Sequence, residues 1–215
     1  MSVTRLALYN IATRFVGERP VDALTENTEA RKLLDEVYTT GDGAVRYLLE
    51  QGNWNFAMRA VEIDSSDDVD PAFGWSFAFA KPTDLVRLNQ ISSEETFNLP
   101  LNQYELEGSY IYANVDPLYL RFVSDDTDWG GDLSKWSPSF ALYAGSWLGT
   151  QIASRLTSNL DLEKLEKRLK RLLVDAQSKD ALQERTRFPP LGNWASSRMG
   201  PRSRRDRGNR SRLIG

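Results

Sequence analysis

The chain has 215 residues, of which 40% are hydrophobic and 27% are charged, so it is long enough for one sizeable folded domain or for a domain with an insert. It contains no cysteine and no histidine, which excludes disulfides, thiolate nucleophiles, zinc fingers and imidazole general bases. No apolar run reaches the roughly 20 residues that a membrane span needs, so we expect no membrane association.

Two helical patterns open the chain. Leu8, Ile11, Ala12 and Phe15 form one apolar stripe and predict a helix over residues 4–16, which Gly17 ends. A second pattern predicts a helix over residues 27–51, although a Gly-Asp-Gly sequence at 41–43 interrupts it. Because the apolar positions keep the same phase on both sides of this sequence, we favour one long helix over two stacked helices.

The period changes from helical to alternating after the second helix. Trp54, Phe56 and Met58 follow Gly52 at every second position, which predicts that a strand begins at Trp54. We expect the aromatic pair to be part of a core at this junction and not a ligand site. Further strand signals are present at Trp75 to Phe79 and at residues 104–107, 110–113 and 118–123, whereas residues 85–88 fit an extended or a short helical form. Residues 53–124 therefore predict a small antiparallel β unit.

Helical patterns return in the last third of the chain. Ser137-Pro138 is a good helix start, and it predicts a helix over residues 138–158. Its glycines Gly145 and Gly149 allow another helix or a neighbouring subunit to approach closely, and we assign them, with Trp147, to a subunit interface. A leucine stripe amid Lys, Arg and Glu predicts a last helix over residues 161–184.

An arginine-rich segment ends the chain. Residues 198–215 contain seven arginines and one aspartate, a net charge of +6, which leaves −9 for residues 1–197 because the total is −3. Past about Arg185 the chain is rich in Pro, Gly, Ser and Arg, so we expect this whole segment to bury too little apolar surface to fold alone. Phe188, Leu191 and Trp194 precede the arginines and resemble a linear motif whose aromatic residue anchors a flexible segment in a partner's pocket.

Two acidic loops, residues 64–70 and 125–132, carry enough carboxylates to be considered for calcium. Neither has the glycine-centred spacing of a calcium loop, so we expect no metal site and no cofactor. The second loop contains Asp125, Asp126, Asp128 and Asp132. Such a patch of negative charge is suited to line a passage through which DNA slides without sticking.

The order of these elements resembles the head-to-tail adaptor proteins of tailed bacteriophages, including the tail tubular protein A group. The match runs through nearly the whole chain, and it depends on the order of its motifs more than on any one of them. The matching segments are Asn10-Ile-Ala-Thr-Arg-Phe-Val-Gly-Glu-Arg-Pro-Val21, with Val16 where isoleucine is usual, Leu48-Leu-Glu-Gln-Gly-Asn-Trp-Asn-Phe-Ala57, Phe79-Ala-Lys-Pro-Thr-Asp-Leu-Val-Arg-Leu88, the hairpin from Tyr104 to Phe122, the Ala- and Gly-rich helix at 138–156, and Trp194-Ala-Ser-Ser-Arg198. The arginine-rich end beyond Met199 is not part of the pattern.

The resemblance implies a nonenzymatic structural protein of the virion neck that assembles in the host cytoplasm. It would form a ring, dodecameric in the family, between the portal protein and the tail nozzle or tail tube, with DNA passing through the bore without sequence-specific binding. The C-terminal segment would embrace the portal. We assign portal binding to seven residues of that segment: Phe188, Leu191, Trp194, Arg198, Arg202, Arg204 and Arg205.

The predicted fold class is α+β, a helical bundle with an inserted small antiparallel β unit and an extended C-terminal tail. The predicted domains are a bundle from residues 1–52 and 130–185, a β insert at 53–129 and the tail at 186–215. Two other functions stay open. One is an arginine-tailed nucleic-acid-binding protein, and the other is a carboxylate-only glycan hydrolase that acts on cell walls.

Overall fold

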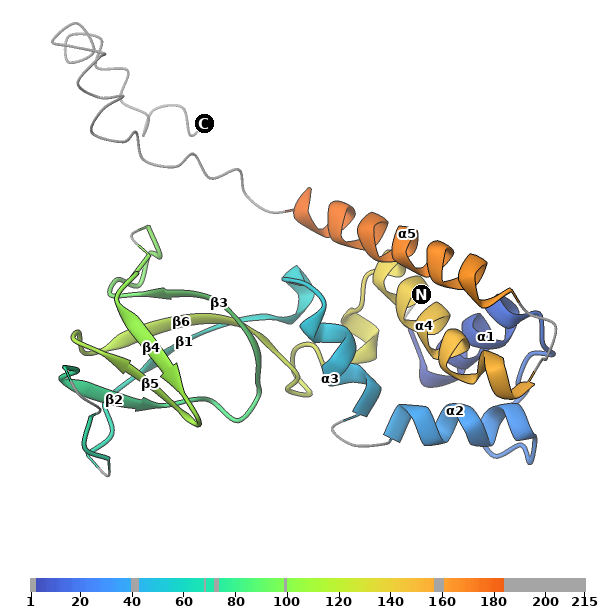
Figure 1. Ribbon diagram of the computed structural model, residues 1–215, viewed down its shortest axis with the longest axis horizontal. Coiled ribbons are helices and arrows are strands. Elements are labelled where there is room, and N and C mark those ends of the chain that lie inside the picture. Colours follow the sequence, from blue (N-terminus) through green and yellow to red (C-terminus); the bar gives the residue numbers. More distant parts are fainter. Residues whose placement is uncertain are drawn as a thin grey trace, which may run out of the picture. The chain divides into compact units, whose positions relative to one another are not determined.

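The computed structural model describes residues 3–39, 43–67, 69–71, 74–98, 100–156 and 161–183. The chain divides into two units, Met1–Glu184 and Arg185–Gly215, and all the described residues belong to the first. This unit is α+β, with helices on both sides of an antiparallel β segment in the sequence, which confirms the predicted fold class for the described ranges (Figure 1). None of the helices in these ranges is long and apolar enough to span a membrane.

The central element of the helical part is α4 (Pro138–Leu156), which contacts α1 (Arg5–Val16), α2 (Glu29–Thr39) and α5 (Leu162–Ala181). Ten of its 19 residues are buried, so it is apolar on nearly every side. The helix starts because the hydroxyl of Ser137 accepts a hydrogen bond from the N–H of Phe140 at 3.3 Å. The predicted helix start at Ser137-Pro138 is therefore confirmed.

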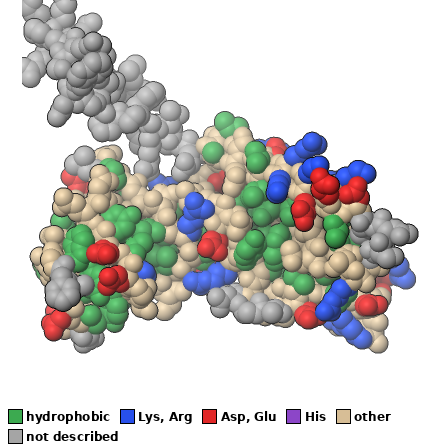
Figure 2. Space-filling view, viewed as in Figure 1, with side chains coloured by type: hydrophobic (Ala, Val, Ile, Leu, Met, Phe, Trp, Pro, Cys, Tyr) green, Lys and Arg blue, Asp and Glu red, His purple; other side chains and the backbone are tan. Residues whose placement is uncertain are grey.

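Local signals also set the ends of α1 and α5. Thr4 caps α1 by accepting from the N–H of Ala7, and Gly17 ends it in the left-handed conformation, with φ of 87°. Asp161 caps α5 in the same way as Thr4 caps α1. Most of the charged side chains of α5 face outward (Figure 2), while its leucine stripe packs against the helical core.

The prediction of one helix over residues 27–51 is wrong. The structure has two helices here, α2 and α3 (Gly43–Glu50), and Figure 1 shows their axes at an angle. Gly43, the first residue of α3, has φ of +83°, which is outside the helical range, so α2 does not continue as one helix into α3. The shared phase of the apolar residues arises because both helices bury their leucines in the same core.

The predicted strand start at Trp54 is also wrong. Residues Asn55–Ala57 form one 3₁₀ turn, closed by a hydrogen bond from the N–H of Ala57 to the carbonyl of Trp54 at 3.0 Å. The first strand, β1, runs from Met58 to Ile63. The turn is favoured because it buries Trp54 and Ala57 together, whereas strand alternation would place them on opposite faces.

The β unit consists of two three-stranded antiparallel sheets. One has the order β1-β6-β3, with β3 at Leu85–Ser92 and β6 at Leu118–Ser124, and the other has the order β2-β5-β4. The three strands of the second sheet are β2 (Phe77–Ala80), β4 (Tyr104–Glu107) and β5 (Tyr110–Ala113). All the predicted strand segments are present, except that Trp75 lies before β2 and that residues 85–88 begin a longer strand.

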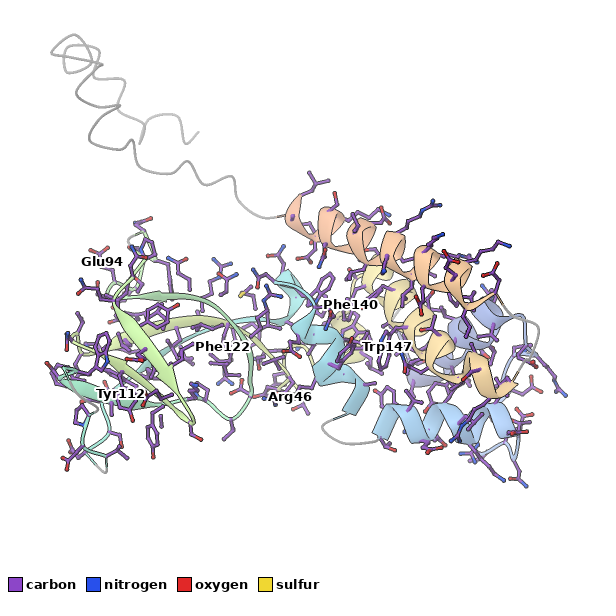
Figure 3. The ribbon with its side chains drawn as sticks, in the orientation of Figure 1. Arg46, Glu94, Tyr112, Phe122, Phe140 and Trp147 are labelled. Atoms are coloured by element: carbon purple, nitrogen blue, oxygen red, sulfur yellow. The ribbon has the colours of Figure 1, made fainter. Side chains whose placement is uncertain are left out.

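The two sheets share one apolar core. Leu118, Leu120 and Phe122 alternate along β6 and pack with Phe79 and Ile111 of the other sheet. Phe122 lies within the β unit in Figure 3, opposite both Arg59 of β1 and Leu88 of β3. The β unit therefore has a core of its own, distinct from that of the helices.

Candidate interaction surfaces

The acidic loop after β6 lies where the β unit meets the helical part. Arg46 of α3 donates one hydrogen bond to Asp125 at 2.7 Å and another to the carbonyl oxygen of Leu85 at 2.9 Å. Figure 3 shows Arg46 at this junction. One guanidinium thus connects α3 to the start of β3 and to the residue that follows β6.

A second arginine completes the junction. Arg59 of β1 forms an ion pair with Asp84 at 2.7 Å and lies 3.3 Å from Asp126. Asp84 also accepts a hydrogen bond of 2.5 Å from the hydroxyl of Ser124. The two arginines and their carboxylates therefore bridge β1, β3 and β6 at the ends that face the helices.

The backbone of this loop is tightly packed. A Cβ atom at Gly130 would overlap the carbonyl oxygen of Ser124, and one at Gly131 would lie 2.5 Å from that of Asp125. The indole N–H of Trp136 donates to the carbonyl of Gly130 at 2.8 Å in a buried position. Only glycine fits at these two positions in the conformation in which the carboxylates of the loop meet their partners.

Hydrogen bonds stabilise the ionised carboxylates of the loop. The backbone N–H of Asp128 holds the pKa of Asp126 below its ordinary value, and the side chain of Ser134, together with its backbone N–H, lowers the pKa of Asp132. Asp132 also caps the short 3₁₀ turn Leu133–Lys135, and Asp128 is exposed. Within the described ranges, no group of three acidic side chains is placed to hold a metal ion.

Three of the four predicted channel residues therefore make contacts that stabilise this chain itself. Asp125 and Asp126 pair with arginines of this chain and Asp132 forms a cap, so much of their negative charge is compensated. Their assignment to a DNA channel stays a prediction, and Asp128 is the carboxylate most exposed for it.

Replacing Arg46 with methionine is expected to lower the free energy of unfolding by about 1 to 2 kcal/mol, because it removes two part-buried hydrogen bonds and leaves Asp125 without its partner. Urea unfolding followed by circular dichroism measures the change. Arg19→Met is the matched control, since the Arg19–Asp22 pair is more than two-thirds exposed on both sides and should contribute little. Equal losses in the two variants would show that the Arg46 contacts do not stabilise the junction.

The predicted subunit contact at Gly145 and Gly149 needs correction. Both glycines are buried and face α1 of the same chain. A Cβ atom at Gly145 would lie 2.6 Å from the Cβ of Ile11, and one at Gly149 would lie 2.7 Å from the carbonyl oxygen of Ala12. The absence of a side chain at both positions thus lets α1 and α4 of the same chain pack closely.

The third residue of that assignment, Trp147, has a different environment. It is half-buried and stacks on Tyr47 of α3, with 5.0 Å between the ring centroids. Tyr47 is 48% exposed. These two residues, called the Tyr47–Trp147 pair below, place an aromatic surface over α3 and α4.

Two polar clusters were not predicted from the sequence. In the first, Asp35 of α2 accepts hydrogen bonds from Arg5 at 2.5 Å, from Tyr9 at 2.6 Å and from Arg31. In the second, Asp180 of α5 accepts from the backbone N–H of Asn55 at 2.9 Å. The first cluster joins α1 to α2, and the second fixes α5 to the turn that precedes β1.

All seven predicted portal-binding residues, from Phe188 to Arg205, lie outside the described residues. When the whole chain is compared with known proteins, no family model matches it, and no match is found among curated proteins.

Proposed function

We propose that the chain is a structural head-to-tail adaptor of a tailed bacteriophage. In this proposal it forms a ring, dodecameric by analogy, between the portal protein and the tail nozzle or tube. DNA passes through the bore, and the protein catalyses no reaction. Its location is the neck of the virion, and its arginine-rich end attaches it to the portal.

The observation that carries the proposal is the order of the elements. Helices α1 to α3 precede a two-sheet β unit, α4 and α5 follow it, and the chain continues into the segment that contains Trp194 and the arginines. The resemblance to the adaptor proteins rests on the same order of motifs. A helical part that surrounds α4 and a β unit with its own core fit a rigid ring subunit.

The Tyr47–Trp147 pair is the surface that we assign to contact between subunits. Large aromatic side chains are enriched at the energetic centres of protein interfaces, and this pair is accessible while Gly145 and Gly149 are not. If the pair is part of the ring contact, Trp147→Ala will shift assembled protein toward monomer in sedimentation velocity.

The decisive experiment is electron microscopy of the purified protein with and without the portal protein of the same phage. Rings that cap the portal are the expected result. Deletion of the residues after Arg185 should leave the circular dichroism spectrum of the folded body unchanged and abolish co-sedimentation with the portal. Full retention of portal binding by the truncated protein would overturn the assignment of the tail, and absence of rings in all samples would overturn the adaptor proposal.

A second candidate function, binding of nucleic acid, is favoured by the seven arginines of residues 198–215. It predicts affinity for duplex DNA that falls steeply as salt is added, because each phosphate contact releases counterions. The same truncated protein distinguishes the two functions. Salt-sensitive DNA binding that disappears with the tail, in a protein that forms no ring, would favour this candidate.

A further inference from the structure

The β unit contains an open cleft between the edges of its two sheets. One wall is formed by Asn89 to Ile91 of β3, and the other by Pro100 to Asn102 and Tyr104 to Leu106, which include most of β4. Its volume is about 590 Å³. Since β3 and β4 each end the strand order of their own sheet, the cleft lies between two sheet edges.

One end of this cleft already shows β-type pairing. Ser92 forms an antiparallel bridge with Pro100, and the N–H of Leu101 donates to the carbonyl of Ile91 at 2.9 Å. Beyond this point β4 pairs with β5 and not with β3, so the two edges separate. A sheet edge carries backbone donors and acceptors that a further extended chain can pair with.

The side chains around the cleft define the chemistry of such a chain. The described lining contains one carboxylate, Glu105, and the side-chain amides of Asn89, Gln90 and Asn102, but no lysine or arginine. Ile91, which is 2% exposed, provides an apolar floor. Residues 58–124 as a whole contain eleven carboxylates and four basic side chains, a net charge of −7.

The β unit carries further carboxylates near the ends of β3 and β4. Glu107 is exposed at the end of β4, and Glu94 and Glu95 are exposed in the loop that follows β3, where Figure 3 shows Glu94. In Figure 2, acidic side chains lie among apolar ones over the β unit, while most of the basic side chains lie over the helices and the junction.

We propose that this cleft binds an extended, basic peptide segment of a partner protein, which adds as a strand to the β4 edge. The backbone of the peptide would pair with Tyr104–Glu107, and alternate Arg or Lys side chains would lie on the side of Glu105, in the negative field of the β unit. This inference does not depend on the adaptor function, because it rests on the edge strands and the charge of the β unit alone.

The test uses the full chain and two fluorescein-labelled nonapeptides, read by fluorescence anisotropy. The first peptide alternates arginine with valine. The second has the same number of arginines, with prolines in place of the valines and placed at both odd and even positions, which keeps the charge but removes backbone N–H groups on both edges of an extended chain. The alternating valine peptide is expected to bind at least about tenfold more tightly than the proline peptide.

A matched pair of variants tests the charge. Glu105→Gln keeps an acceptor for the indole N–H of Trp75, which donates to Glu105 at 3.0 Å, so the fold should be unaffected. This variant should bind the valine peptide about threefold more weakly. Glu166→Gln, on the exposed side of α5, should bind it as the unchanged protein does.

Hydrogen–deuterium exchange followed by mass spectrometry locates the bound peptide. Slower exchange within Tyr104–Glu107, with no change in α4, is the expected result. Equal affinity for the two peptides, equal affinity of the two variants, or unchanged exchange in β4 would each overturn the proposal.

Discussion

Replacing Trp54 with alanine is expected to lower the free energy of unfolding by about 4 kcal/mol. The indole is 1% exposed and lies in the helical core, 4.5 Å from the ring of Phe140 and 6.2 Å from that of Phe56. Its removal leaves a cavity at the point where the chain passes from α3 into β1. Urea unfolding, monitored by far-ultraviolet circular dichroism, measures the loss.

Two further variants show whether the loss reflects packing at this position. The N–H of Trp54 is buried without a hydrogen-bond partner in the described residues, so Trp54→Phe removes an unsatisfied donor and should cost only about 1 kcal/mol. Trp75→Ala, at a partly exposed tryptophan of the β unit, should cost about as little. If Trp54→Ala destabilised no more than Trp75→Ala, the indole would not be a principal element of the core.

Elements with strong local signals could be predicted from the sequence. A capping side chain precedes both α1 and α4, and glycine ends α1, so these boundaries depend on residues within a few positions of each other. The segment predicted at residues 118–123 is β6, where buried Leu118, Leu120 and Phe122 alternate with half-buried Tyr119 and Arg121.

Features that depend on distant contacts could not be predicted in this way. The turn at Trp54 exists because the indole packs on α4, more than eighty positions later in the chain. Asn55 and Asp180 are 125 positions apart, and no pattern in the sequence relates them. The break before α3 was missed because the apolar period alone does not report the positive φ of Gly43.

The acidic loop at residues 125–132 also depends on contacts that the sequence does not reveal. From the sequence, residues 125–132 are an acidic loop without visible partners. The arginines that compensate it, Arg46 and Arg59, lie on α3 and β1, far from the loop in the sequence, and meet it only in the folded protein. A cluster of like charges in a sequence therefore says little about the net field at that place in the folded protein.

Substituting Gly149 with leucine is expected to lower the free energy of unfolding by about 3 kcal/mol, and with alanine by about 1 kcal/mol. Any Cβ at this position meets the backbone of α1, with the carbonyl oxygen of Ala12 at 2.7 Å and its Cα at 3.3 Å, so α1 must move away from α4. The alanine variant loses less because it adds only the Cβ atom, whereas leucine adds three further carbon atoms at the same contact. Both variants regain part of the cost because alanine and leucine favour a helix over glycine by up to about 1 kcal/mol. Gln151→Leu introduces the same side chain at an exposed position of α4 and should change stability little. Sedimentation velocity distinguishes a contact with α1 from a contact with a neighbouring subunit. If Gly149 contacted another subunit, its substitution would change the oligomeric state and leave the free energy of unfolding of the monomer unchanged.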